Sequence, residues 1–269
     1  MRTIFSSARR LTIAACATAL MTSGCSAREA YENSFSLGWP SPKTEQAHSM
    51  YNMWLGSVAA AAAIGVVMYL IIAITVVRDR KKTEELPPQI RYNLPIEVLY
   101  TVVPFVIIAV LFFYTAVAEN KVNKLTKNPD VTIGVVGFQW NWQFNYMNDK
   151  VQVTGEPAAG RAAVLVLPVD KKIRFIETSP DVIHSFWVPD FLFKRDVIPG
   201  RLNTFELKPT VEGTYTGRCA ELCGEKHDRM NFTVKVVSQS QYDTYIAGLK
   251  ADPNAAANSL SAALPTGSN

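Results

Sequence analysis

The sequence predicts a membrane-anchored chain in which a two-helix transmembrane hairpin is followed by an all-β sandwich or barrel. Two apolar runs, residues 53–77 and 94–118, each exceed the length of about 20 residues that a helix needs to cross the hydrocarbon core. From residue 131 the apolar pattern becomes short and alternating, which is typical of strands. The composition, 48% hydrophobic and 19% charged, suits a membrane protein with a soluble portion.

The N-terminus is typical of an exported protein. In residues 1–24, basic side chains precede an apolar stretch and then small residues, which is the pattern of a secretion signal peptide. The segment Thr22-Ser-Gly-Cys25 resembles a lipoprotein processing site, so we expect Cys25 to become a lipidated N-terminus. Ordinary cleavage and an uncleaved anchor are the alternatives. Residues 25–52 are expected to form an irregular exported segment, in which His48 is assigned no metal.

The loop between the two apolar runs indicates how the hairpin lies in the membrane. Residues 78–93 carry five basic side chains against three acidic ones, and such loops stay on the cytoplasmic side. Both ends of the hairpin are then expected outside the cell. Within the two runs only Glu97 is charged at neutral pH. The net charge of +4 is spread out, which does not favour nucleic acid as a partner.

Residues 119–250 are expected to form the soluble domain. The stretch Phe138–Tyr146 alternates aromatic and polar side chains, which predicts one strand with two different faces. Further strands are predicted at 163–167, 173–176, 183–188, 203–207, 214–218 and 232–237. After Ser238 a short amphipathic helix is expected, with a capping box from Ser240 to Asp243. Residues 251–269 are expected to be a disordered tail.

A cluster of metal-binding side chains stands between the last two predicted strands. Cys219, Cys223, His227 and Met230 follow the spacing C-x3-C-x3-H-x2-M. Thiolates and thioethers are soft ligands that favour copper. His184, in an apolar stretch that precedes Pro189, is a candidate for a second imidazole.

Three other interpretations of these residues remain open on spacing alone. In an oxidising compartment Cys219 and Cys223 are able to form a disulfide. Two cysteines with two histidines also make a structural zinc site. One cysteine, two histidines and a methionine are the ligands of a mononuclear blue-copper site. The second thiol argues against the mononuclear site, because two thiolates and two imidazoles are enough to bridge and terminate a pair of copper ions.

At these residues the chain resembles subunit II of bacterial cytochrome c oxidases. The resemblance rests on Cys-Ala-Glu-Leu-Cys-Gly-Glu-Lys-His with Met230, on the stretch from Ile183 to Pro189, and on Ile198-Pro-Gly-Arg201. It implies a cupredoxin-like sandwich with a binuclear copper-A centre. The ligands that it implies are His184, Cys219, Cys223, His227, Met230 and the main-chain carbonyl of Glu221.

The same resemblance implies roles for three further groups. Trp140 matches the tryptophan at which electrons from cytochrome c enter, whereas its pattern alone is that of a sheet-face aromatic residue. The Glu221 carboxylate is expected to reach a magnesium ion shared with the catalytic subunit. Glu97 matches a glutamate at the entrance of a proton pathway, although an acid in the first turn of a helix also has a simpler explanation in the helix dipole.

The resemblance further implies a complete function for the chain. As an oxidoreductase subunit in the bacterial inner membrane, with its copper domain and both termini outside, it would accept electrons from cytochrome c. It would pass them to haem in the catalytic subunit I, where O₂ is reduced and protons are pumped. The haems belong to the partner subunits, and no C-x-x-C-H haem motif occurs here.

Other functions are consistent with part of this pattern. A copper-free subunit II of a quinol oxidase shares the hairpin and the sandwich, but it has no use for the full ligand set. A membrane-anchored copper carrier satisfies the ligand chemistry and leaves Trp140 and Glu97 unexplained. A copper-A domain of nitrous oxide reductase leaves the two spans unexplained.

Overall fold

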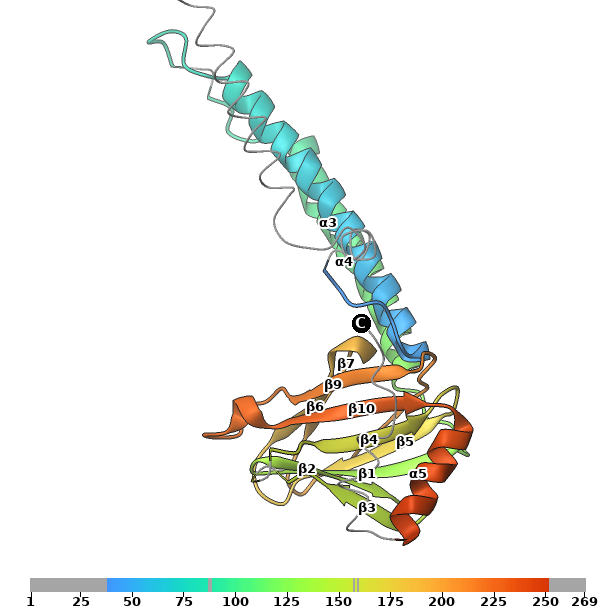
Figure 1. Cartoon of the computed structure of the whole chain (residues 1–269). Coiled ribbons are helices and arrows are strands. Elements are labelled where there is room, and N and C mark those ends of the chain that lie inside the picture. The colour runs from blue at the N-terminus through green and yellow to red at the C-terminus, as the bar shows by residue number, and fades with distance from the viewer. Residues whose placement is uncertain (1–37, 87–88, 157, 159, 252–269) are drawn as a thin grey trace, which may run out of the picture. The chain divides into compact units, whose positions relative to one another are not determined.

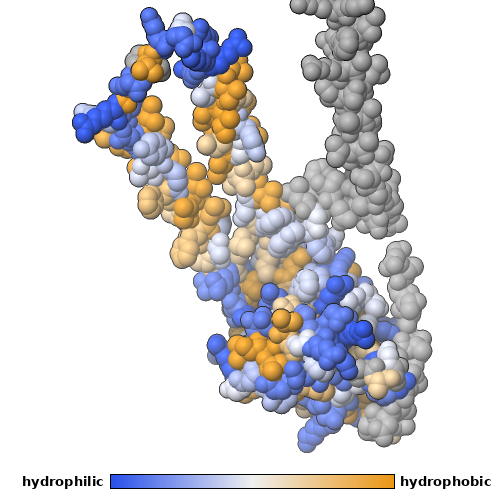
Figure 2. Space-filling model, turned by 90° about the vertical axis from the view of Figure 1, so that its left-hand side faces the viewer, coloured by the Kyte–Doolittle hydropathy of each residue, from blue (hydrophilic) through white to orange (hydrophobic). Residues whose placement is uncertain are grey.

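Two long helices open the part of the chain that the structure describes. The computed structural model describes residues 38–86, 89–156, 158 and 160–251, and a compact unit begins at Pro42 (Figure 1). Helix α3 (Glu45–Arg78) has 34 residues and helix α4 (Leu94–Val122) has 29. Both contain the predicted spans and are long and apolar enough to cross a membrane. Hydrophobic side chains lie exposed along both helices, and hydrophilic ones gather at the loop between them (Figure 2).

Helix α3 begins at Glu45, within a segment that was predicted to be irregular. The Thr44 side chain accepts a hydrogen bond from the Ala47 amide at 3.0 Å and so caps the helix. Glu45 adds an acid in the first turn, where the helix dipole favours it. The prediction of irregular structure up to residue 52 was therefore wrong for residues 45–52. His48 lies exposed on this first part of the helix.

Among the described residues, ten strands form two five-stranded sheets, and a short helix follows them (Figure 1). One sheet has the order β3-β2-β1-β5-β8 and the other β4-β10-β9-β6-β7. The strands are β1 (Val131–Phe138), β2 (Asn141–Tyr146), β3 (Val151–Thr154), β4 (Ala163–Pro168), β5 (Ile173–Thr178), β6 (His184–Val188), β7 (Phe193–Val197), β8 (Asn203–Leu207), β9 (Gly213–Cys219) and β10 (Asn231–Val237). The predicted fold class, a helical hairpin followed by an all-β sandwich, is thus confirmed.

The structure corrects the predicted strand across Phe138–Tyr146. Strand β1 ends at Phe138 and pairs back with β2 from Asn141, so Gln139 and Trp140 form the turn of a hairpin. Within Phe138–Tyr146, the alternation of aromatic and polar residues corresponds to buried and less buried strand positions only in β2, where Trp142, Phe144 and Tyr146 are buried. Sequence periodicity did not show the turn because neither turn residue is a glycine or a proline.

Strands β3 and β7 have no counterpart in the sequence prediction, and of β1 only its last residue, Phe138, was included. Strand β3 has only four residues. Strand β7 carries three consecutive charged residues, Lys194, Arg195 and Asp196. Both lie at the edges of their sheets, where short and charged strands are common because they discourage pairing with other chains.

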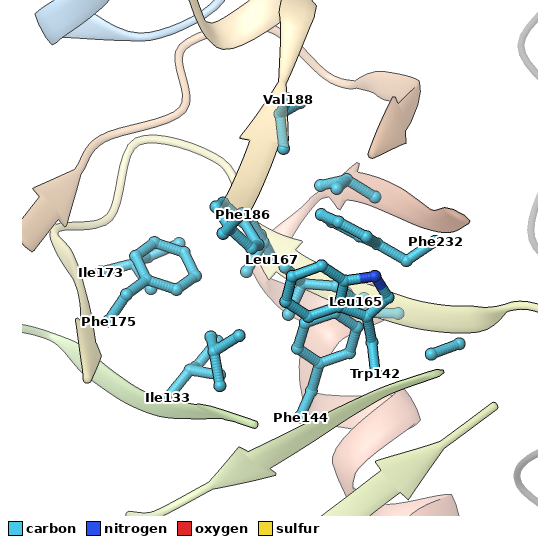
Figure 3. Packing of buried hydrophobic residues seen from close by; sticks show 14 of the residues in the cluster. Ile133, Trp142, Phe144, Leu165, Leu167, Ile173, Phe175, Phe186, Val188 and Phe232 are labelled. Carbon is cyan, nitrogen blue, oxygen red and sulfur yellow. The ribbon is translucent and has the colours of Figure 1, made fainter. Parts of the chain in front are cut away.

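An aromatic core joins the two sheets (Figure 3). Trp142 of β2 packs edge-on against Phe186 of β6 and Phe232 of β10, with ring centroids 6.2 and 5.2 Å apart. Phe186 stacks on Phe232 at 5.0 Å. Such pairs contribute about 0.5–1.5 kcal/mol each beyond the area they bury. This packing holds β6 and β10 in fixed relation to β2.

Helix α5 (Gln239–Ala251) closes the described chain. Its predicted apolar face is confirmed, because the four predicted side chains are all buried: Tyr242, Tyr245, Ile246 and Leu249. The predicted capping box was wrong by two residues. Ser238 and Gln241 form it, since the Gln241 side chain accepts from the Ser238 amide at 3.1 Å and the Ser238 hydroxyl accepts from the Gln241 amide at 3.4 Å.

Candidate metal centre

The sequence from Cys219 to Met230 forms one loop between the antiparallel strands β9 and β10, as predicted. Its two ends are joined directly, because the Cys219 amide donates to the Met230 carbonyl at 3.0 Å. A short 3-10 helix, η3 (His227–Arg229), turns the chain back before β10. The loop is therefore a closed hairpin connection, and its ends are fixed by the sheet beneath it.

Strand β6 carries His184 to this loop from 35 residues away in the sequence. It pairs with β9, placing Phe186 opposite Cys219. The Ala220 amide donates to the Ser185 carbonyl at 3.1 Å and extends the ladder into the loop. His184, at the start of β6, thereby faces the two thiols.

The predicted ligand side chains lie in a continuous series of short contacts. The Sγ atom of Cys219 is 3.9 Å from His184 Nδ1 and 3.8 Å from Cys223 Sγ. The Sγ atom of Cys223 is in turn 3.6 Å from His227 Nδ1 and 3.7 Å from Met230 Sδ. His184, Cys219 and Cys223 offer ligand atoms within 4.8 Å of one another.

The main-chain oxygen of Glu221 completes the group. It lies 3.3 Å from Cys219 Sγ, while the Glu221 side chain is exposed to solvent. The carbonyl and the carboxylate of this one residue therefore point to different surroundings, which suits the two roles expected for it. No described contact tests a magnesium ion.

Cys219 and Cys223 are free thiols in this structure. Their sulfur atoms are 3.8 Å apart, well beyond the roughly 2.05 Å of a disulfide bond. Both side chains are buried, as are His184 and Met230, while His227 is half-buried. The disulfide interpretation is not what the structure shows.

The two thiols differ in acidity. Burial raises the pKa of Cys219, but hydrogen bonds from His184, from main-chain amides and from His227 outweigh it and lower the pKa. Burial raises the pKa of Cys223, and the negative charge on Cys219 raises it further. The charge of one thiolate therefore opposes loss of the proton from the other.

Asp181 is a residue of the candidate site that the sequence analysis missed. One of its carboxylate oxygens lies 2.9 Å from His184 Nε2, on the side of the ring away from the thiols. Burial raises its pKa, but hydrogen bonds from Gln139, His184, Val182 and Ser179 outweigh it and lower the pKa to about 2. A ligand histidine is commonly held in orientation by such a carboxylate. An acid three residues before a candidate ligand is the available sequence signal.

Trp140 lies against the metal loop, in the turn between β1 and β2. Its indole Nε1 donates to the Cys223 carbonyl at 3.3 Å, and the Gln139 side chain donates to the same oxygen at 2.8 Å. Lys226 lies 5.6 Å from the centre of the Trp140 ring. A Cβ atom at Gly224 would come within 3.1 Å of the ring. Trp140 is thus not the sheet-face aromatic residue that its pattern suggested.

The nearby Trp142 has a different place, within the core. It is fully buried, and its Nε1 donates to the Met230 carbonyl at 3.2 Å. Its ring packs edge-on against His184 with centroids 6.3 Å apart. Trp142 therefore contacts two candidate ligands, Met230 and His184.

Glu97 lies apart from this group, in the first turn of α4. Its carboxylate accepts a hydrogen bond from the Asn93 amide at 2.9 Å. Asn93 caps the helix through its own side chain. The structure therefore gives the helix-end explanation of Glu97 a specific contact, and it does not test a proton pathway.

The donor set suits copper better than the alternatives. A structural zinc site needs four ligands, and two thiols with two imidazoles would supply them. The buried thioether of Met230 and the carbonyl of Glu221 would then have no purpose beside the sulfurs. A mononuclear copper site would leave one thiol without a role. Two soft sulfur donors at the centre, with further donors at both ends, are suited to a pair of copper ions.

Comparisons with known proteins agree on one family. The family model described as "Cytochrome C oxidase subunit II, periplasmic domain" matches residues 160–237. A protein of Streptomyces avermitilis named "Probable cytochrome c oxidase subunit 2" is 45% identical over 251 residues, covering 79% of each chain. The "Cytochrome c oxidase subunit 2" of Mycobacterium tuberculosis is 36% identical over 300 residues, covering 88% of this chain and 81% of that one.

A solved structure is also similar in sequence. It is the periplasmic domain of subunit II of cytochrome oxidase from Bradyrhizobium japonicum, which is 32% identical. The match covers 47% of this chain and 98% of that one, with a TM-score of 0.43.

Proposed function

We propose, from the premise that this chain belongs to the cytochrome c oxidase subunit II family, that it is the electron-accepting subunit of such an oxidase. In this proposal it takes electrons from cytochrome c and delivers them toward haem in the catalytic subunit. The observation that supports it best is the series of contacts from His184 through Cys219 and Cys223 to His227 and Met230.

The chain's own residues would hold two copper ions, which when bound supply one-electron oxidation and reduction. The donors that would hold them are the thiolates of Cys219 and Cys223, the side chains of His184, His227 and Met230, and the Glu221 carbonyl. The buried setting excludes water, and the aromatic core beneath the loop keeps the ligands from moving. A rigid, dry site lowers the reorganisation that accompanies electron transfer.

The copper content of the purified full-length chain tests this function. We expect two copper ions per chain and an electron spin resonance signal from one unpaired electron shared by both. One zinc ion per chain, or a metal-free chain with a Cys219–Cys223 disulfide, would contradict the proposal. A metal-free chain would favour the structural subunit of a quinol oxidase. Copper that is readily given up to a chelator would favour a copper carrier.

The remaining parts of the proposal concern the surroundings of the chain. The two helices would span the bacterial inner membrane, with the loop 78–93 inside and the sandwich outside, since positive loops stay in the cytoplasm. The Glu221 carboxylate would bind magnesium at the boundary with the catalytic subunit. The expected signal peptide and the lipidation site at Cys25 lie outside the described residues.

We further propose that Glu97 collects protons for the catalytic subunit. A carboxylate within a span costs a few kcal/mol, so its presence calls for a reason. Glu97→Ala is expected to lower steady-state turnover of the assembled oxidase, while copper content and electron transfer from cytochrome c stay normal. Glu97→Asp should retain part of the rate.

The contact with Asn93 provides the control for this experiment. Asn93→Ala removes the helix cap but leaves a carboxylate at residue 97. If turnover depends on the helix end alone, Asn93→Ala should slow the enzyme as much as Glu97→Ala does. A fully assembled Glu97→Ala enzyme with normal turnover would show that Glu97 serves only the helix.

A further inference from the structure

Glu177 is a buried carboxyl group that the copper centre does not use. It lies on β5, opposite Val135 of β1 and Asn203 of β8, and its side chain is fully buried. Neither of its carboxyl oxygens has a hydrogen-bond partner within the described residues. Leaving a charged carboxylate in such surroundings would cost far more than the stability of a domain allows. The Glu177 carboxyl group is therefore expected to hold a proton, to bind a water molecule, or both.

A second acid in the same sheet shows how a charged carboxylate is accommodated here. Glu206 on β8 is also buried, but it forms a salt bridge with Arg174 at 2.6 Å. It also accepts hydrogen bonds from the amide and the hydroxyl of Thr126, at 3.0 and 3.3 Å. Glu206 thus has the complete set of partners that Glu177 lacks, on an adjacent strand.

The cation to consider for Glu177 is Arg195 of the edge strand β7. Asn203, which lies opposite Glu177 on β8, donates a hydrogen bond to the carbonyl of Asp196, the residue after Arg195. The Nε of Arg195 is buried and lacks a hydrogen-bond partner within the described residues. Its Nη2 donates to Asn123 Oδ1 at 2.5 Å, and its guanidinium lies 5.5 Å from the centre of the Phe193 ring. No salt bridge joins Arg195 to Glu177 in the part of the chain that is described. The Nε–H of Arg195 and the carboxyl oxygens of Glu177 are polar groups that a bound water molecule would satisfy.

A cavity of about 320 Å³ adjoins Arg195. Polar side chains line part of it: Asn123, Glu119, Lys194 and Arg195. Arg195 therefore borders this cavity, while its Nε is buried.

We propose that Glu177 and Arg195 form a buried proton-binding site, in which a neutral carboxyl group shares bound water with the guanidinium. The proton comes from solvent. The charged groups that act on Glu177 are both on β7, since Arg195 favours its ionisation and Asp196 opposes it. The facing residues on β1 and β8, Val135 and Asn203, carry no charge. The proposal does not depend on the copper function, because it is measurable without metal.

The acidity of Glu177 sets the pH range of the test. Burial, with a smaller effect of Asp196, raises its pKa to about 9 against the attraction of Arg195. The folded chain then keeps a proton that the unfolded chain loses above about pH 4.3. Because the folded state binds more protons than the unfolded state between these values, this group makes the protein less stable as pH rises from about 4.3 to about 9.

Infrared spectroscopy of the full-length chain detects the proton directly. At about pH 7.5, where ordinary carboxyl groups are ionised, we expect a C=O absorption of a carboxylic acid that Glu177→Gln removes. Glu206→Gln is the matched control and should leave that absorption in place. In D₂O the absorption should shift while the protein remains folded. A wild-type spectrum without the band, or a shift only after unfolding, would overturn the proposal.

Two further measurements separate this site from a simple packing effect. The melting temperature of Glu177→Gln should exceed that of the wild type by an amount that grows from about pH 5 to about pH 9. Arg195→Gln should move the loss of the C=O absorption to higher pH, because it removes the attracting charge. A stability difference that does not vary with pH, or an unchanged titration in Arg195→Gln, would contradict the site.

Discussion

Replacing Cys223 with serine is expected to abolish the paired copper centre. The sulfur of Cys223 contacts three of the other candidate donors, at 3.8 Å to Cys219, 3.6 Å to His227 and 3.7 Å to Met230. A hydroxyl group is a poorer ligand for copper than a thiolate. We expect copper affinity to fall by more than about 100-fold, which exceeds the loss caused by removing an outer-shell partner. Copper analysis and electron spin resonance of the purified variant measure this.

Because serine and cysteine are similar in size, a loss of copper in Cys223→Ser would report the loss of the sulfur ligand. Serine is nearly isosteric with cysteine, so the sandwich should fold, and circular dichroism checks that it does. Two methionine variants, one at the site and one away from it, supply a comparison. Met230→Leu removes a buried thioether at the site and should alter the copper spectrum, while Met147→Leu changes an exposed side chain and should not. A Cys223→Ser variant that still binds two copper ions with an unchanged spectrum would refute the assigned ligands.

The sequence was sufficient for the parts of the fold that depend on local pattern. The lengths of the two apolar runs predicted α3 and α4, and β-rich runs predicted most strands of the sandwich. The start of α3 was missed because a threonine cap in a polar segment has a weak signal. Strand β7 was missed because its three charged residues do not resemble a strand in the sequence. They are tolerated because β7 lies at the edge of its sheet, and only the assembled sheet shows that position.

The candidate site could be predicted only where its residues are close in the chain or resemble a family motif. The loop from Cys219 to Met230 is local, so its spacing was informative. His184 was proposed as a second imidazole from its apolar stretch, and the family resemblance made it one of the expected ligands. Asp181 and Gln139 were not predicted, since their importance comes from the pairing of β6 with β9 and from the turn after β1. Glu177 was not predicted either, because burial without a partner is a tertiary property.

Trp140→Phe is expected to slow electron transfer from cytochrome c by at least tenfold, which corresponds to about 1.4 kcal/mol in the barrier. The indole lies against the metal loop, because its Nε1 donates to the Cys223 carbonyl and a Cβ atom at Gly224 would come within 3.1 Å of the ring. Phenylalanine keeps a ring at this position but lacks the N–H donor. The Gln139 side chain still binds the same carbonyl, so the loop should hold its shape. Stopped-flow mixing with reduced cytochrome c measures the rate.

The choice of control decides what this experiment shows. Trp142 is unsuitable, because its hydrogen bond to Met230 and its packing on His184 make its loss a disturbance of the ligands themselves. Trp187 is better, since it is half-buried on β6 and pairs with Arg218 rather than with the metal loop. If Trp140 is where electrons enter, Trp140→Phe should be slow with an unchanged copper spectrum, and Trp187→Phe should be close to the wild type. Equal slowing in both variants, or a changed spectrum in Trp140→Phe, would mean that Trp140 serves packing, because a structural defect affects the ligands as well as the rate.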